Sequence, residues 1–108
     1  MAISLSQLTR ASAPKPPRIL IHGVAGVGKT TFAANANHPV FIQTEDGLGT
    51  LEANHFPMAR TFDDVIECLV SLYNEEHDFK TVVVDSADWL EPLIWAKTCK
   101  EYGWKDLE

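Results

Sequence analysis

The chain has 108 residues, of which 45% are hydrophobic and 22% are charged, and this balance is that of one small globular domain. It excludes a disordered tail, a collagen-like fibre and a disulfide scaffold. No apolar run approaches the roughly 20 residues of a membrane-spanning helix, and no signal-peptide pattern opens the chain. We therefore expect a cytoplasmic protein without a membrane partner. Its two cysteines, Cys68 and Cys99, lack metal-ligand spacing and are expected to be buried, reduced thiols.

The net charge of −6 is unevenly distributed along the chain. Residues 1–18 carry three basic side chains and no acid, whereas the remaining six basic and fifteen acidic residues leave a body of net charge −9. An acidic body binds nucleic acid poorly, because it repels the phosphate backbone. Any contact with DNA is therefore expected from the basic arm or from a local patch.

The chain divides into a lead-in and one domain. Residues 1–17 are predicted to be a flexible, basic, proline-rich lead-in, because the closely spaced prolines favour extended backbone and stop a helix. Residues 18–108 are predicted to belong to one domain. Within it, the apolar run 18–22 predicts a buried strand, and good helix formers predict a helix over 29–36.

Further elements alternate in the same way. Residues 40–43 predict a second buried strand, and the polar, glycine-containing residues 44–60 predict a loop. Helical periodicity with a capping box predicts a helix over 61–76, and β-branched residues predict a strand over 81–85. A last helix is expected from near Asp88 to Gly103. Strands that alternate with helices indicate an α/β fold, a parallel sheet with helices on both faces.

Residues 23–30 read Gly-Val-Ala-Gly-Val-Gly-Lys-Thr and fit the phosphate-loop pattern G-x-x-x-x-G-K-[ST]. Glycines allow the tight turn and let backbone N–H groups approach phosphate oxygens, while the lysine supplies positive charge to the β- and γ-phosphates. The threonine hydroxyl is a ligand for Mg²⁺. The expected nucleotide-binding residues are Gly23, Val24, Ala25, Gly26, Val27, Gly28, Lys29, Thr30 and Thr31.

Two acidic residues complete the predicted site. Asp85 ends the valine-rich strand and is expected to orient Mg²⁺ together with Thr30. The next residue is Ser86, at the position where many ATPases carry the glutamate that activates water. Glu45 lies just past the carboxyl end of the neighbouring strand, where active sites of α/β sheets form, and is the candidate catalytic base beside Lys29. The neighbouring acid Asp46 is a weaker candidate.

The phosphate loop, the segment Phe-Ile-Gln-Thr-Glu at 41–45 and the segment Val-Val-Val-Asp-Ser at 82–86 resemble a RecA-type ATPase core. Over about residues 18–105 the chain looks closer still to phage-encoded AAA-domain ATP-binding proteins, some of whose relatives act in single-strand annealing recombination. The resemblance implies ATP and Mg²⁺ as cofactors, Glu45 as the residue that activates water, and single-stranded DNA and further copies of the chain as partners. It also implies the cytosol of a bacterial host. A RecA-like core has at least two more strands, so residues 18–108 are expected to be the N-terminal part of a P-loop NTPase domain and the chain an N-terminal fragment.

Three functions are consistent with the sequence. The leading one is a Mg²⁺-dependent ATPase that serves phage DNA recombination, annealing or replication. A small-molecule or nucleoside kinase shares the phosphate loop, but Arg60 is the only arginine after residue 18 and no arginine-rich lid is visible. A non-catalytic nucleotide-binding module is the third.

The tryptophans at 89, 95 and 104 are expected to lie in a core or a covered interface more than to serve as stacking platforms for bases.

Overall fold

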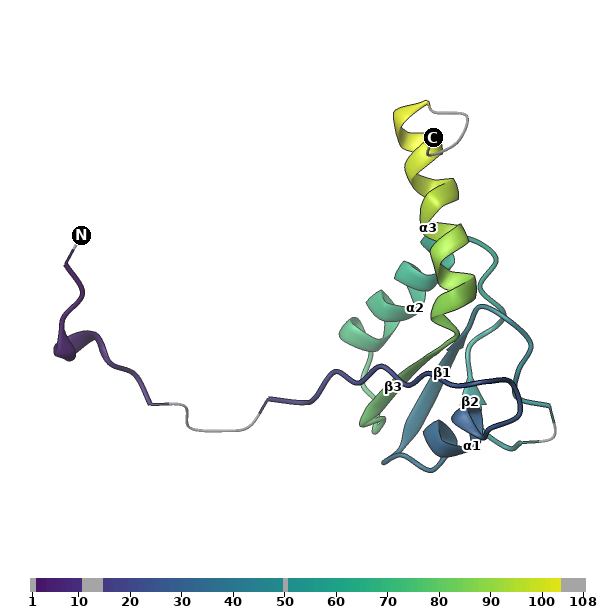
Figure 1. Cartoon of the computed structure of the whole chain (residues 1–108), viewed down its shortest axis with the longest axis horizontal. Coiled ribbons are helices and arrows are strands. Elements are labelled where there is room, and N and C mark those ends of the chain that lie inside the picture. The colour runs from purple at the N-terminus through teal and green to yellow at the C-terminus, as the bar shows by residue number, and fades with distance from the viewer. Residues whose placement is uncertain (1, 11–14, 50, 104–108) are drawn as a thin grey trace.

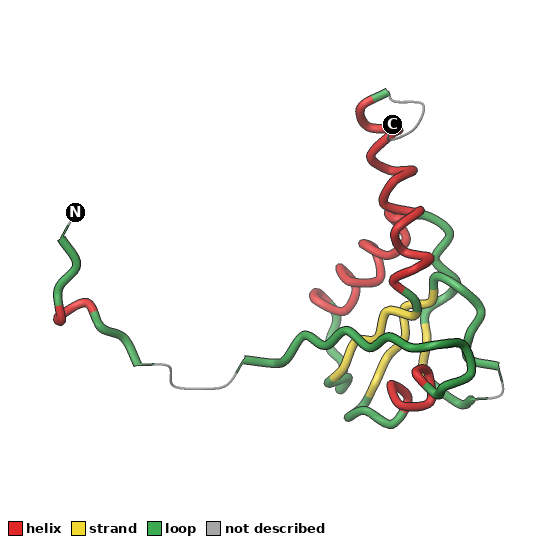
Figure 2. Tube along the Cα trace, viewed as in Figure 1, coloured by secondary structure: helices red, strands yellow, loops and turns green. Residues whose placement is uncertain are grey.

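The computed structural model of the chain describes residues 2–10, 15–49 and 51–103. Figures 1 and 2 show a small α/β body from which the N-terminal segment extends. The elements in chain order are η1 (Leu5–Gln7), α1 (Lys29–Ala34), β1 (Pro39–Gln43), β2 (Asn54–His55), α2 (Phe62–Asn74), β3 (Thr81–Asp85) and α3 (Ala87–Tyr102).

The sheet has three parallel strands in the order β2-β1-β3. In the register of the longer pair, Pro39 lies opposite Thr81 and Gln43 lies opposite Asp85. Both strands therefore end at the same edge of the sheet, and the residues that follow them start from adjacent positions. The predicted fold class, an α/β protein with a parallel sheet and flanking helices, is confirmed.

The core lies between β1 and two helices. Ile42 is fully buried and clusters with Val65 and Cys68 of α2, and Leu93 of α3 packs against the same cluster. Phe41 alternates to the opposite face of β1 and is fully buried too. Both faces of the central strand are therefore covered, as its uninterrupted apolar sequence predicts.

The start of α2 follows the predicted capping box. The Thr61 hydroxyl accepts a hydrogen bond from the Asp64 backbone N–H at 3.1 Å, and the Asp64 carboxylate accepts from the Thr61 N–H at 3.2 Å. The carboxylate also accepts from the Arg60 backbone N–H at 2.9 Å, and this bond above all lowers the pKa of Asp64. The helix ends at Asn74, two residues before the predicted end. The last helix, α3, ends as predicted at Gly103, which caps it with a φ of 69°.

Two predicted elements differ from the structure. The prediction of a strand over 18–22 is wrong: β1 pairs with β2 and β3 on its two edges, and 18–22 joins neither of them as a strand. The side chains of Ile19 and Leu20 are 74% and 78% exposed. An apolar run forms a strand only where a partner's free backbone lies within pairing distance, and composition does not reveal that. Conversely, the predicted loop 44–60 contains β2, whose two exposed residues carry no strand pattern.

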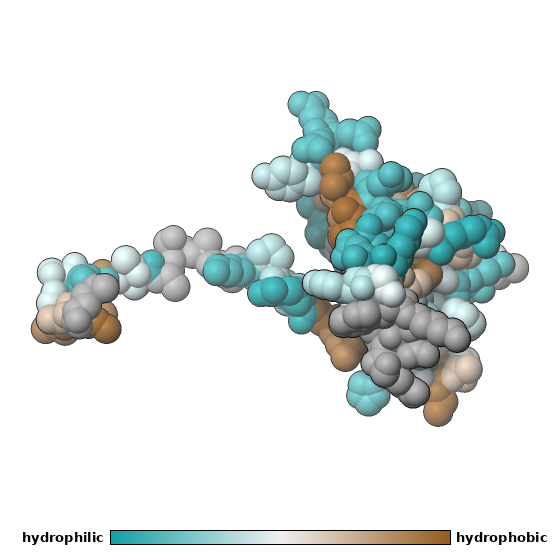
Figure 3. Space-filling model, turned by 90° about the horizontal axis from the view of Figure 1, so that it is seen from above, coloured by the Kyte–Doolittle hydropathy of each residue, from teal (hydrophilic) through white to brown (hydrophobic). Residues whose placement is uncertain are grey.

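The N-terminal segment, defined as residues 2–10 and 15–22, is exposed throughout the part of it that the structure describes. In Figure 3, apolar surface gathers at its tip, where Ile3, Leu5 and Leu8 are exposed. This exposure is compatible with the predicted lead-in, whose boundary at residue 17 stays a prediction. Among the described helices, none has the length and apolar character needed to cross a membrane.

The two cysteines are both free thiols. Cys68 is buried on α2, and this burial raises the pKa of its thiol. Cys99 is only partly buried, so the prediction of two buried thiols is confirmed for the first alone.

Candidate functional site

The phosphate loop forms a tight turn directly before α1. Gly26 and Gly28 have φ values of 80° and 105°, in the left-handed region where other residues are strained. The Val27 N–H donates to the Val24 carbonyl at 3.3 Å, which closes the turn. Helical bonding starts at once, because the Phe32 N–H donates to the Gly28 carbonyl at 2.9 Å. The loop conformation therefore requires glycine at position 28, which the motif fixes, and at position 26, which the motif leaves open.

Lys29, the first residue of α1, turns its side chain back onto the loop. Its ammonium donates hydrogen bonds to the carbonyls of Gly23 and of Val24, the latter at 3.1 Å. Its positive charge is thus held against the loop that precedes the helix. An anion that approaches the loop's backbone N–H groups meets this charge.

The next residue of α1 connects the loop to the sheet. The Thr30 hydroxyl donates to the Asp85 carboxylate at 2.8 Å, although the two residues are 55 positions apart in the sequence. Thr30 lies on the first turn of α1 and Asp85 is the last residue of β3. A hydroxyl and a carboxylate are hard oxygen ligands of the kind that Mg²⁺ prefers, so this pair fits a magnesium ion bound beside nucleotide phosphates.

Glu45 lies at the same edge of the sheet, two residues past the end of β1. Its Oε2 accepts a hydrogen bond from the Ser86 hydroxyl at 2.7 Å. Gly47 lies between the two acids: a methyl group built on it would be 3.6 Å from an Asp85 carboxylate oxygen and 3.8 Å from Glu45 Oε1. Both carboxylates therefore border one small space beside Gly47.

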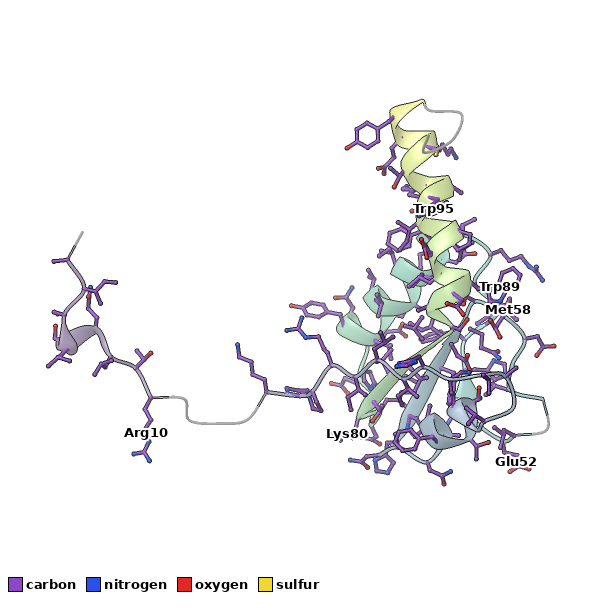
Figure 4. The ribbon with its side chains drawn as sticks, viewed as in Figure 1. Arg10, Glu52, Met58, Lys80, Trp89 and Trp95 are labelled. Atoms are coloured by element: carbon purple, nitrogen blue, oxygen red, sulfur yellow. The ribbon has the colours of Figure 1, made fainter. Side chains whose placement is uncertain are left out.

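A hollow of about 460 Å³ opens beside Glu45. Apolar side chains form much of its wall, among them Trp89 and Leu93 of α3 and Met58. Figure 4 shows Met58 and Trp89 close together near the base of α3. Glu45 is therefore bordered by the hydroxyl of Ser86 and by a largely apolar hollow.

The structure brings three of the predicted site residues, Thr30, Glu45 and Asp85, to one edge of the sheet. Thr30 and Asp85 are in direct contact, Lys29 is held on the loop, and Glu45 lies beside the residue that follows Asp85. Trp89 and Trp95 are 57% and 50% exposed, so the structure does not support the core placement of these two. Trp104 lies outside the described residues.

Sequence reasoning missed three residues of this site. The Thr44 hydroxyl binds the backbone of Ser86, the Ser86 hydroxyl binds Glu45, and Gly47 lies close to both carboxylates. The signal that could have found the first two is positional, because polar residues that directly follow two paired parallel strands meet at one edge. Ser86 was noticed only as a position that lacks a glutamate.

One comparison with known proteins identifies a family. A family model described as an AAA domain matches residues 15–106, which is most of the chain and includes the phosphate loop, Glu45 and Asp85. A search of curated proteins found no significant match, and a search of solved structures found none either. The match covers the loop and the strand whose last residue contacts it, so the chain belongs to the AAA domain family of P-loop NTPases.

Proposed function

We propose that the protein is a Mg²⁺-dependent ATPase whose reaction takes place at the carboxyl ends of β1 and β3. The observation that carries the proposal is the contact between the Thr30 hydroxyl and the Asp85 carboxylate, 2.8 Å apart, with Glu45 at the same edge. Membership of the AAA domain family supports a nucleotide as the ligand. A kinase would need an acceptor site, and no described feature requires one.

Each residue has a defined role in this proposal. The backbone N–H groups of residues 23–28 bind the phosphates, and the Lys29 ammonium exchanges its loop carbonyls for β- and γ-phosphate oxygens. Thr30 and Asp85 hold the metal ion, which when bound neutralises charge on the phosphates. Phosphoryl transfer needs positioning and charge stabilisation more than covalent chemistry, so these contacts supply most of the catalysis.

Glu45 prepares the attacking water. Its Oε2 is occupied by the hydrogen bond from Ser86, which leaves Oε1 to accept a proton from water in the space beside Gly47. General-base assistance of this kind contributes about 10²–10⁴-fold to a rate. The carboxylate therefore acts on the water and not on nucleotide binding, and the two functions can be separated by mutation.

The test is Glu45→Gln in the full chain. We expect binding of Mg²⁺-ATP to be unchanged and phosphate release to fall by about a hundredfold or more, because an amide cannot accept the proton. Glu52→Gln is the matched control: it makes the same change seven positions later, at an exposed residue that Figure 4 shows at the outer edge of the body. Retained turnover in Glu45→Gln would remove Glu45 from the role. A phosphorylated acceptor in place of free phosphate would show a kinase instead.

The proposal extends to a nucleic-acid transaction. Arg10, Lys15 and Arg18 lie on the exposed N-terminal segment, and Figure 4 shows Arg10 well away from the acidic body. We expect this segment to supply phosphate contacts, so single-stranded DNA binding should weaken as salt rises and should be lost when the three residues are replaced by alanine. Unchanged DNA affinity in that variant would exclude the segment. The phage recombination setting and the homo-oligomer are supported by the resemblance to phage ATPases alone.

A further inference from the structure

Ser86 occupies a capping position without capping its helix. It is the N-cap residue of α3, with φ −129° and ψ 164°, the conformation from which a serine hydroxyl accepts a bond from the helix's first N–H groups. Its side chain makes no such bond. The hydroxyl donates instead to Glu45 Oε2 at 2.7 Å, across 41 positions of sequence. Capping therefore does not explain the direction of this side chain.

Thr44 fixes the backbone from which that hydroxyl projects. Its own hydroxyl donates to the Ser86 carbonyl at 2.7 Å and accepts from the Ser86 N–H at 2.8 Å. Its backbone N–H donates to the Asp85 carbonyl at 2.9 Å, one step past the register of Gln43 with Asp85. Both residues are half-buried. The Thr44 hydroxyl thus binds both backbone groups of Ser86, the residue whose side chain contacts Glu45.

We infer that Ser86 is a positioning residue that holds the Glu45 carboxylate in place through its hydroxyl, with Thr44 fixing the backbone of Ser86. The inference rests on the proposed function, in which Glu45 prepares water. A half-buried glutamate on a loop has several rotatable bonds and would otherwise sample many orientations. A bond to Oε2 selects one orientation and leaves Oε1 directed to the reaction space beside Gly47.

The mutational test compares two N-cap residues, Ser86, whose side chain does not bond to its helix, and Thr61, whose side chain does. Ser86→Ala should lower kcat by about tenfold to a hundredfold, the usual effect of losing a hydrogen bond to a charged group, with KM for ATP and the midpoint of thermal unfolding unchanged. Ser86→Thr, which keeps a hydroxyl, should recover most of kcat. Thr61→Ala is the matched control, because Thr61 does cap its helix: it should lower the unfolding midpoint and leave kcat unchanged. An Ser86→Ala protein that loses stability and keeps kcat would overturn the inference.

Two further comparisons separate this inference from the proposed function. In a Glu45→Gln background, Ser86→Ala should have no further effect on turnover, because the group that it positions is gone. If Glu45→Gln itself keeps turnover, the proposed role of Glu45 fails and the role of Ser86 fails with it, while the ATPase activity stands. If Glu45→Gln loses turnover while Ser86→Ala does not, only the positioning role fails.

A spectroscopic measurement tests the contact without turnover. Three-bond couplings about χ1 of Glu45, measured by NMR in the full chain, should be those of one rotamer in the parent and in Ser86→Thr. They should approach averaged values in Ser86→Ala. Averaged couplings in the parent chain would contradict the inference directly.

Discussion

The phosphate loop and the carboxyl ends of β1 and β3 belong to one site but are held in place by different means. Every described residue from 15 to 28 is exposed, and the Thr30–Asp85 bond is the side-chain hydrogen bond by which this part of the chain reaches the sheet. At the strand ends, four hydrogen bonds join residues 44 and 45 to residues 85 and 86. The groups proposed to act on water are therefore fixed by the sheet, and those proposed to bind phosphate are fixed by their own turn.

The largest effect is expected on stability, because apolar side chains are buried in the sheet and exposed in the segment before the phosphate loop. Ile42→Ala removes a fully buried side chain of β1 and should lower the free energy of unfolding by about 2–5 kcal/mol. Leu20→Ala, at a side chain that is 78% exposed, should change it by less than about 0.5 kcal/mol. Equilibrium unfolding in urea measures both. Equal losses would show that the side chain of Leu20 is buried in the folded protein.

The Thr30–Asp85 hydrogen bond, which joins the two regions, is tested by Asp85→Asn. The amide keeps the size of the side chain and removes the charge, so turnover should fall by about a hundredfold and more Mg²⁺ should be needed for half-maximal rate. Asp78→Asn, a charge change at an exposed residue three positions before β3, is the control. Steady-state rates across a Mg²⁺ titration give both quantities. An unaltered Mg²⁺ requirement would remove Asp85 from metal binding.

A smaller effect is expected from Gly47→Ala, which places a methyl group between the two carboxylates. The backbone there is not left-handed, and the nearest oxygen would be 3.6 Å away, so the fold should be unchanged. Turnover should fall roughly tenfold, because the methyl group occupies space assigned to water. Gly49→Ala is the control. Its φ of 56° strains alanine, so stability should fall, but nothing lies near the added methyl group, so turnover should be unchanged. Full activity in Gly47→Ala would place the reaction elsewhere.

The smallest effect is expected in α2, which lies outside the site, and it concerns how stability depends on pH. Hydrogen bonding from the Arg60 N–H lowers the folded-state pKa of Asp64 below its usual 3.8. The stabilisation is therefore present above about pH 4 and is lost as the pH falls through the lower, folded-state value. Thermal unfolding of the parent chain and Asp64→Asn should differ at about pH 6 and converge in strong acid. A difference that persists in strong acid would mean that charge on Asp64 is not its cause.

The same contrast explains which features the sequence could predict. Strands β1 and β3 and helices α2 and α3 carry signals in their own residues: continuous apolar runs, a capping box at Thr61 and a terminal glycine at position 103. The signal of the phosphate loop is equally local, because the backbone conformation of its turn requires glycine at positions 26 and 28. The sequence predicts the pairing of Thr30 with Asp85 only through the known geometry of the motif.

Other features depend on what lies next to a segment in space. The run 18–22 has the composition of a strand but no neighbouring strand to pair with among the described residues, and β2 has a neighbour but no strand composition. The bonds of Thr44 and Ser86 depend on register, which follows from the packing of whole strands. The sequence therefore predicts the residues of the proposed phosphate site, but it does not predict the hydrogen bonds around its proposed base.

The central claim is that the phosphate loop and the end of β3 form a Mg²⁺-nucleotide site, and calorimetric titration of Mg²⁺-ATP into the full chain tests it most directly. The parent should give saturable heat, and Lys29→Ala, which removes the charge held on the loop, should weaken binding by at least about tenfold. Lys80→Ala, an exposed lysine at the opposite end of β3, should bind as the parent does. Equal binding by the parent and Lys29→Ala would contradict the account, since the nucleotide would then be held somewhere other than the phosphate loop.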